Sequence, residues 1–243
     1  MNPVSDPHPH PSPSPSPEPT ARSAPQAPAA ATLFLARHGE TVWHAENRYT
    51  GVSDIGLTPR GLEQAGELGV WAGGARLDAL VTSPLSRARR TAEPAARTTG
   101  LTAAVEPELT ELDFGVAEGR TLAELRLSHP RETAAFLRDP AAHPLPGGED
   151  PGAAAGRGAA ALLRIAAAAP GRRVLVVAHN TLFRLVLCRL LGIPESSYRR
   201  VLPGLRNCAV TEVRVTGGQA ALLSYNVPTE NMPTENVSAE RPF

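Results

Sequence analysis

The most informative stretch of this chain is Leu35-Ala-Arg-His-Gly-Glu-Thr-Val-Trp43. Its first two residues end an apolar run, which predicts a buried strand, and Arg37 and His38 follow where that strand would stop. A second apolar run, at residues 174–178, also ends in a histidine, His179. Because a neutral imidazole can attack phosphorus, two histidines at the ends of two strands indicate phosphoryl chemistry.

The pattern around these runs is that of a layered α/β domain at residues 31–226, in which short apolar runs alternate with longer amphipathic ones. Thr58 and Pro59 suit a helix start, Gly100 and Gly192 follow helix ends, and Pro130 breaks one helical segment in two. We expect strands at residues 32–36, 79–82, 102–105, 174–178, 209–215 and 220–224, the last two joined at Gly217-Gly218, and helices from residue 58 and at 86–99, 122–138, 151–169 and 180–191.

Two flanking segments lack an apolar period and are predicted to be disordered tails. Residues 1–30 are rich in proline, serine and alanine, and residues 227–243 repeat Pro-Thr-Glu-Asn. His8 and His10 stand among prolines, so we interpret them as solvated residues rather than metal ligands.

The composition excludes several classes of function. The 24 basic residues, all arginines, balance 24 acidic ones, so no global field draws the chain to nucleic acid or to an anionic membrane. The absence of lysine removes Schiff-base chemistry, whereas arginine forks suit phosphate. Cys188 and Cys208 form no CxxC pair, which argues against a disulfide framework or a cysteine-rich zinc site. With no secretion signal or long apolar segment, we expect a cytoplasmic protein.

Three of the predicted strand ends carry polar residues of one kind: Arg37 with His38, the segment from Ser83 to Arg87, and His179. In an open α/β sheet, ligands collect at the carboxyl ends of the strands. If these strands are neighbours, two arginines and two histidines converge there. Such a cluster can hold a phosphoryl group, because arginine forks donate to its oxygens and an imidazole can attack its phosphorus.

Four groups of residues, taken in order, carry a resemblance to a known family. They are Arg37-His38-Gly39-Glu40-Thr41 with Asn47, Thr50-Gly51 and residues 57–65; residues 82–88 with Thr91-Ala92; residues 109–115 with Glu118-Gly119; and residues 176–179 with Arg184. Through them, over roughly residues 32–226, the chain resembles the histidine phosphatase superfamily, which includes the cofactor-dependent phosphoglycerate mutases and many small-molecule phosphatases. The resemblance implies a phosphoglycerate mutase-like fold: a three-layer α/β/α sandwich around a mostly parallel sheet.

The resemblance also implies a two-step transfer without a cofactor. His38 would attack a phosphate monoester, become phosphorylated and then be freed by water. Arg37, Arg87 and His179 would surround the phosphoryl oxygens, where positioning and electrostatics do most of the catalytic work. Glu111 matches the family's proton donor, which protonates the leaving alkoxide.

Other polar residues of these elements have open or weaker roles. From the residues alone, Glu108, Asp113 and Glu118 compete with Glu111, which is favoured because it lies four residues before Gly115 in the matched element. Thr50 and Gly51 match substrate-contacting positions of the mutases, and Asn47 joins them as a predicted substrate-binding residue. Glu40 suits fixing its loop as well as touching substrate, and Trp43 and Tyr49 suit either the pocket or the core.

Two positions depart from the family's pattern, and both stay among the predicted substrate-binding residues. His44 stands six residues beyond the expected nucleophile, where the family usually has an asparagine whose amide donates to the phosphoryl group. An imidazole N–H can also donate, with a different reach and pH dependence. Asn180 follows the second histidine, where the family commonly has glycine. Because asparagine tolerates unusual backbone angles, we expect the backbone N–H contact there to survive.

The predicted function is the hydrolysis of a small-molecule phosphate monoester without a metal ion. In the mutases a basic segment is added between the acid and the second histidine, but here that interval is rich in alanine, proline and glycine, and its arginines are scattered. Arg172 and Arg173 precede a buried strand and are expected at the opposite end of the sheet. Residues 146–149, Pro-Gly-Gly-Glu, resemble a loop of the phosphatase branch that helps to close the site.

Two alternatives remain: a phosphoglycerate mutase, and a non-catalytic phosphate-binding module of the same fold. Metal-dependent hydrolysis is disfavoured because the sequence has no HExxH and no carboxylate cluster at ligand spacing. The choice among sugar phosphates, phosphoglycerate derivatives and nucleotide-loop precursors stays open, as does the oligomeric state.

Overall fold

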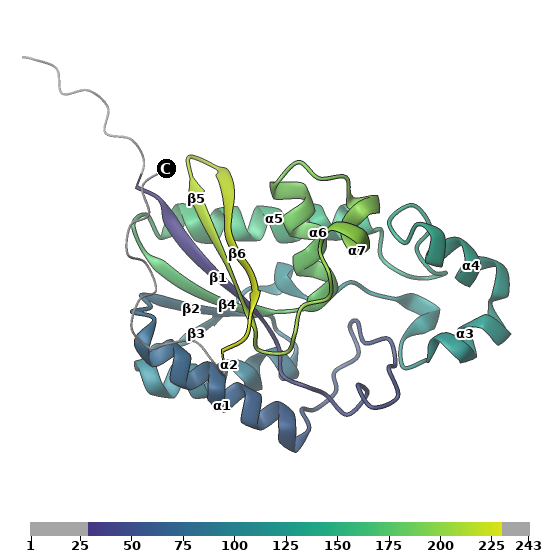
Figure 1. Cartoon of the computed structure of the whole chain (residues 1–243), viewed down its shortest axis with the longest axis horizontal. Helices are drawn as coiled ribbons and strands as arrows, with labels where there is room; N and C mark the ends of the chain where they lie inside the picture. The colour runs from purple at the N-terminus through teal and green to yellow at the C-terminus, as the bar shows by residue number, and fades with distance from the viewer. Residues whose placement is uncertain (1–28, 230–243) are drawn as a thin grey trace, which may run out of the picture.

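The computed structural model describes residues 29–229, in which six strands form one mixed sheet with the order β3-β2-β4-β1-β5-β6 (Figure 1). Strands β1 to β4 are parallel to one another, whereas at one edge β5 is antiparallel to β1 and β6 is antiparallel to β5. The strands are β1 (Ala31–Arg37), β2 (Ala79–Thr82), β3 (Ala103–Val105), β4 (Arg173–Ala178), β5 (Val210–Thr216) and β6 (Gln219–Val227).

The register of the central strands brings their polar ends together. Arg37 pairs with Ala178, the residue before His179, and the backbone N–H of His38 donates to the carbonyl of Ala178 at 3.0 Å. The N–H of Ser83, just beyond β2, donates to Val177 at 3.0 Å. Strands β2, β4 and β1 are therefore neighbours, as the convergence of two arginines and two histidines requires.

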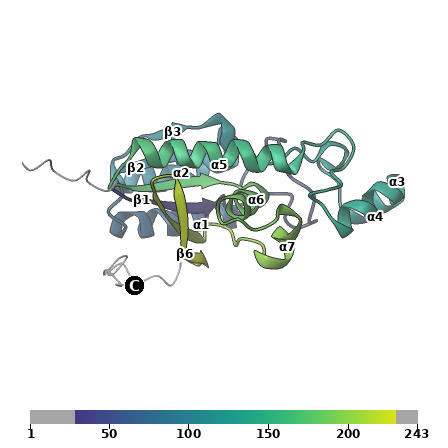
Figure 2. The same ribbon diagram turned by 90° about the horizontal axis from the view of Figure 1, so that it is seen from above.

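Helices cover both faces of the sheet, because the central strands are apolar on both sides. Leu33 and Leu35 of β1 pack in the cluster of α5 (Pro151–Ala168) and α6 (Asn180–Leu190). Phe34 and Ala36 pack in the cluster of α1 (Pro59–Gly74) and α2 (Ser86–Thr99). Figure 2 shows α5 and α1 on opposite sides of the sheet. The predicted three-layer α/β/α fold is confirmed.

The shorter elements lie beyond the carboxyl ends of the parallel strands. Helices α3 (Leu122–Ser128) and α4 (Pro130–Arg138) stand apart from the sheet (Figure 1) and are separated at Pro130, as predicted. The others are η1 (Pro107–Leu109), η2 (Gly115–Ala117), η3 (Glu195–Ser197) and α7 (Tyr198–Val201).

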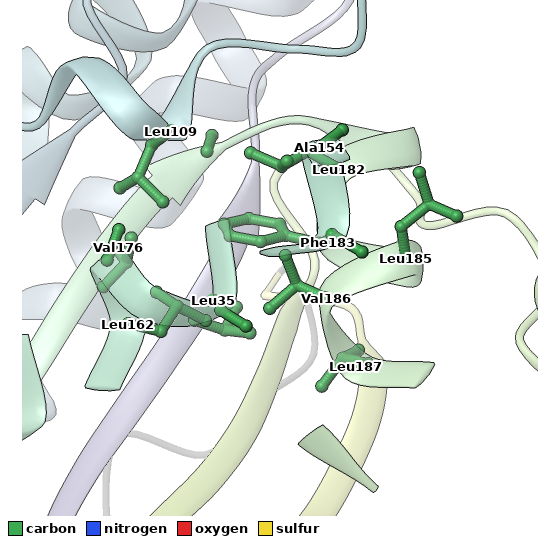
Figure 3. Packing of buried hydrophobic residues seen from close by; sticks show 14 of the residues in the cluster. Leu35, Leu109, Ala154, Leu162, Val176, Leu182, Phe183, Leu185, Val186 and Leu187 are labelled. Atoms are coloured by element: carbon green, nitrogen blue, oxygen red, sulfur yellow. The ribbon is translucent and has the colours of Figure 1, made fainter. Parts of the chain in front are cut away.

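Helix α6 is largely buried and packs against β1 and β4 directly next to the ends of these strands. Its residues from Thr181 to Cys188 are all buried, and Phe183 packs in one cluster with Leu35, Val176 and Leu162 (Figure 3). Truncating such a side chain costs about 3–5 kcal/mol. The start of α6, directly after His179, is therefore held firmly against β1 and β4.

The ends of the chain differ slightly from the expectation or fall outside the described residues. Strand β6 runs to Val227, the first residue of the predicted C-terminal tail. The remaining tail residues up to 28 and from 230, including His8 and His10, lie outside the described part, so the predicted domain limits stay predictions. Within residues 29–229, no helix is long and apolar enough to span a bilayer.

Candidate active site

The largest group of predicted site residues meets in one cavity at the carboxyl edge of the sheet. The cavity encloses about 750 Å³, part of it open solvent. Its lining is Arg37, His38, His44, Asn47, Arg48, Tyr49, Thr50, Glu111, Phe114, Asn180, Thr181, Arg184, Tyr198 and Arg199. Arg87 and His179 are fully buried behind this lining.

His38 has one ring nitrogen bound and the other available. Its Nδ1 lies 2.7 Å from the carbonyl oxygen of Gly39, which can only accept, so Nδ1 carries the proton. The lone pair is then on Nε2. Burial, followed by the charges of Arg37 and Arg87, lowers the pKa of His38 well below its usual value. The imidazole is consequently neutral at physiological pH, which is the form that can act as a nucleophile.

His179 lies beside His38, with 5.3 Å between the ring centroids. Its Nε2 lies 2.7 Å from the hydroxyl oxygen of Ser83, and its Nδ1 has no partner. Burial and then the charge of Arg87 lower the pKa of His179 well below its usual value. A neutral ring whose Nε2 accepts from Ser83 has an Nδ1–H left to donate.

Three buried nitrogens around His38 lack hydrogen-bond partners: Nε of Arg37, Nε of Arg87 and Nδ1 of His179. Leaving a buried donor unsatisfied costs about 1–3 kcal/mol. Within residues 29–229 the only other such nitrogen is Nε1 of Trp71, a buried residue of α1. A multi-oxygen anion in front of His38 would satisfy the three site donors together.

The remaining guanidinium nitrogens of these two arginines are held by the backbone and by His44. Arg87 donates from Nη1 to the carbonyl of Ser53 at 2.8 Å and from Nη2 to that of Gly51 at 2.6 Å. Arg37 donates from Nη1 to the carbonyl of Leu205 at 2.7 Å. Burial lowers the pKa of Arg37 to about 10, so its guanidinium keeps its charge at neutral pH. Both cations are thereby fixed before an anion arrives.

Gly51 serves the site through Arg87 and is not itself in the cavity lining. A Cβ at this position would lie 2.1 Å from a carboxylate oxygen of Glu118 and 2.3 Å from the carbonyl of Leu112, so only glycine fits. Asn47 and Thr50 do line the cavity. Asn47 adopts a left-handed backbone with φ of 53°, a conformation that asparagine tolerates better than most residues.

Glu111 is buried, with 4% of its surface exposed, at the amino end of α6. Its carboxylate accepts from the backbone N–H groups of Leu112 at 2.9 Å, Thr181 at 3.0 Å and Leu182 at 2.8 Å. Burial raises the pKa of Glu111, and these three hydrogen bonds partly oppose the rise. The competing acids Glu108, Asp113 and Glu118 do not line the cavity.

His44 lines the cavity, but both of its ring nitrogens have protein partners. Its Nε2 lies 2.7 Å from Nη2 of Arg37, and a guanidinium can only donate, so Nε2 is an acceptor. Its Nδ1 lies 2.8 Å from the hydroxyl oxygen of Thr41. Burial, followed by the charge of Arg37, lowers the pKa of His44 to about 4. N–H donation from His44 to a phosphoryl group stays a prediction, but in this geometry both ring nitrogens face protein groups.

Asn180 starts helix α6 with an ordinary backbone, because it is not among the residues of positive φ. The expected use of asparagine's tolerance for unusual angles is therefore not needed here. Instead, its side-chain oxygen accepts from the N–H of Leu205 at 2.9 Å, which ties α6 to the segment before β5. Glu40 accepts from the hydroxyl of Thr58 at 2.8 Å and fixes its loop outside the cavity.

Sequence reasoning missed part of the cavity wall. It assigned no role to Arg48, Phe114, Thr181, Arg184, Tyr198 or Arg199, all of which line the cavity. One available signal was the Tyr-Arg-Arg run at residues 198–200, placed in a connection after a predicted helix rather than on a periodic surface. Among the residues that the structure describes, no group of three or more His, Cys, Asp or Glu could hold a metal ion.

The chain is also similar to known proteins. The model of the histidine phosphatase superfamily, branch 1, matches residues 33–228. A probable phosphoglycerate mutase GpmB of Erwinia tasmaniensis is 33% identical over 181 residues, which is 74% of this chain and 83% of that protein. A probable phosphoglycerate mutase GpmB of Salmonella choleraesuis has the same identity and coverage.

Solved structures point to the same fold. A mycobacterial glucosyl-3-phosphoglycerate phosphatase is 27% identical with a TM-score of 0.74, covering 82% of this chain and 99% of that one. The alpha-ribazole phosphatase of Shigella flexneri is 27% identical with a TM-score of 0.73, covering 83% and 99%. The chain therefore belongs to the histidine phosphatase superfamily.

Proposed function

We propose that this protein hydrolyses a small-molecule phosphate monoester through a phosphohistidine on His38. The observation that carries the proposal is the set of three unpartnered buried nitrogens, on Arg37, Arg87 and His179, beside an imidazole whose Nε2 lone pair is available. These donors would hold the equatorial oxygens of the phosphoryl group as its charge develops.

The first step forms a bond between Nε2 of His38 and phosphorus while the bond from phosphorus to the ester oxygen breaks. Glu111 gives its proton to the leaving alkoxide, a role that its raised pKa supports. In the second step water attacks the phosphohistidine, Glu111 takes a proton from that water, and the bond to nitrogen breaks. His38 and Glu111 then have their starting protonation, and inorganic phosphate leaves.

Water is proposed as the acceptor rather than a second substrate hydroxyl. Arg173 is one of the basic residues before the second histidine, but it lies at the amino end of β4, far from His179. There its guanidinium lies 4.7 Å over the ring of Phe34 and donates to the carbonyl of Ala75. The mutase function stays a second candidate, because the similar curated proteins carry that name.

Phosphoglycerates separate these two functions. Supplied with 3-phosphoglycerate or 2-phosphoglycerate, the purified protein should release inorganic phosphate without accumulating the other isomer. Isomerisation without phosphate release would overturn hydrolysis in favour of mutase activity. Rapid acid-free quenching with a labelled ester should trap an acid-labile phosphoprotein, and its absence from a protein that still turns over would overturn the phosphohistidine.

Two finer properties belong to the same proposal. Hydrolysis is expected to proceed without a metal ion, so activity should survive dialysis against a strong chelator, and loss restored by added metal would overturn that expectation. We also propose a cytoplasmic location, which fractionation of cells expressing the full chain would test.

A further inference from the structure

Arg184, Tyr198 and Arg199 form one wall of the cavity, here called the outer wall. Arg184 is buried and anchors the short helix α7: its Nε donates to the carbonyl of Leu202 at 2.7 Å, its Nη2 approaches that of Tyr198 at 3.5 Å, and its guanidinium lies 4.7 Å from the Tyr198 ring. The outer wall is thus built onto α6 by a buried cation.

Arg199 is held in place by aromatic rings and not by an acid. Its guanidinium lies 4.7 Å over the ring of Phe136 and 5.6 Å from that of Tyr198, and its Nε donates to the Tyr198 hydroxyl at 3.0 Å. In the described part of the chain it forms no ion pair, whereas Arg48, the other surface arginine of the cavity, is paired with Glu46 and Glu124. Both terminal nitrogens of Arg199 therefore remain free to donate.

The cavity as a whole carries more positive charge than a phosphoryl group needs. Its lining contains four arginines and a single acid, Glu111, although the chain is neutral overall. The proposed phosphoryl site uses Arg37 together with the buried Arg87. Because Glu46 and Glu124 neutralise the charge of Arg48, Arg184 and Arg199 leave a local excess of positive charge that favours a second anion.

We propose that the outer wall binds a second anionic group of the substrate, so that the substrate class is a phosphate monoester carrying an additional carboxylate or phosphate. This inference rests on the proposed phosphatase function. The free fork of Arg199 would donate two parallel hydrogen bonds to that group, a geometry suited to either oxyanion. Tyr49, Phe114 and Tyr198 would face the carbon skeleton between the two anionic ends.

Matched substrates test the proposal with the full chain. Glycerol 3-phosphate has a neutral end, 3-phosphoglycerate puts a carboxylate there, and glycerol 1,3-bisphosphate puts a phosphate there; p-nitrophenyl phosphate reports the phosphoryl site alone. We expect kcat/KM to be about 10- to 100-fold higher for at least one doubly anionic ester than for glycerol 3-phosphate, as charge-assisted hydrogen bonds allow. The preferred ester shows whether the second group is a carboxylate or a phosphate.

Arg199→Gln should abolish this preference mainly by raising KM, while kcat/KM for p-nitrophenyl phosphate stays within about twofold. Arg200→Gln is the matched control, because Arg200 is the exposed neighbour that donates to Ser197 and does not line the cavity. Equal melting temperatures of the two variants would exclude a folding defect. Equal wild-type kcat/KM for the neutral and doubly anionic esters, or a preference unchanged in Arg199→Gln, overturns the inference. Failure of the wild type to hydrolyse any of the esters overturns the proposed function instead.

Discussion

The two ends of the cavity are built in different ways. At the inner end, four side chains follow strand ends and are oriented by hydrogen bonds. Those of His38 to Gly39, Arg87 to Gly51 and His179 to Ser83 are buried, and that of Arg37 to Leu205 is partly buried. At the outer wall, Tyr198 and Arg199 sit on a four-residue helix anchored by one buried arginine. The carboxyl ends of the central strands hold side chains with the precise positions that phosphoryl transfer needs, whereas a connection can change its side chains without disturbing the sheet.

The greatest loss of activity is expected from His38→Ala. If the inner end performs the chemistry, kcat/KM should fall by at least about 10⁴-fold for every ester, charged or neutral, because the nucleophile is lost. Phosphate release and trapping of the phosphoprotein measure the loss. His143→Ala, at an exposed loop histidine, is the control and should keep full activity. A loss confined to doubly anionic esters would place His38 in recognition rather than in chemistry.

Glu111→Gln should produce the next largest effect. We expect kcat to fall by about 10² to 10⁴-fold for alkyl esters, and by less for p-nitrophenyl phosphate, whose leaving group needs no proton. Because burial raises the pKa of Glu111, its proton-donating form persists to higher pH than usual and activity should decline as pH rises through that pKa. That limb of the pH profile should vanish in the variant.

The exposed Glu108 supplies the control, as Glu108→Gln should leave both rate and pH profile unchanged. If this control behaves like Glu111→Gln, the proton donor has been assigned to the wrong residue.

Arg157 tests whether the inner end depends on bonds beyond the cavity. It pairs with Glu149 at 2.7 Å and donates to the carbonyls of Glu108 at 2.6 Å, Thr110 at 2.7 Å and, more weakly, Glu111 at 3.3 Å. Arg157→Gln should lower kcat about 10-fold by loosening the Glu111 loop, and lower the free energy of unfolding by about 1–3 kcal/mol.

If the decline of activity at high pH shifts in Arg157→Gln, Arg157 has a positioning role, because a loss of stability alone would leave the pKa of Glu111 unchanged. Arg164→Gln removes an exposed ion pair to Glu106 and serves as the control, with an expected change in stability below about 1 kcal/mol. Equal changes in kcat and in the pH profile of the two variants would contradict a positioning role for Arg157.

His44→Asn should change the activity least, and it tests one contact within the inner end. Neutral His44 accepts from Arg37, so this contact should be lost as pH falls through its pKa of about 4. The variant should change kcat/KM by no more than about threefold at pH 7, since an asparagine oxygen can also accept, and should remove the acid limb near that pKa. If the acid limb of the pH profile were identical in the wild type and the variant, the contact between His44 and Arg37 would have no effect on activity.

The two ends were also unequally predictable from the sequence. His38 and His179 follow apolar runs directly, so their placement at strand ends could be inferred from the pattern, whereas the structure shows that the two strands are neighbours. Arg199 belongs to no periodic surface, and a charged residue in a connection is solvated more often than it is functional. Nothing local distinguishes it from Arg200, because the stacking on Phe136 joins residues 63 apart in the chain.

Local patterns in the sequence were enough to predict the layered fold and the order of the strands along the chain, because hydrophobic periodicity is a local property, and the strand-end motifs with the family resemblance supplied the candidate reactive residues. Three features became visible in the folded chain alone: Glu111 is the acid buried against the start of α6, His44 accepts from Arg37, and the terminal nitrogens of Arg199 stay free. Burial, the direction of a hydrogen bond and an unpaired charge depend on contacts between segments far apart in the sequence, such as the packing of α6 against the sheet and of α7 against α6.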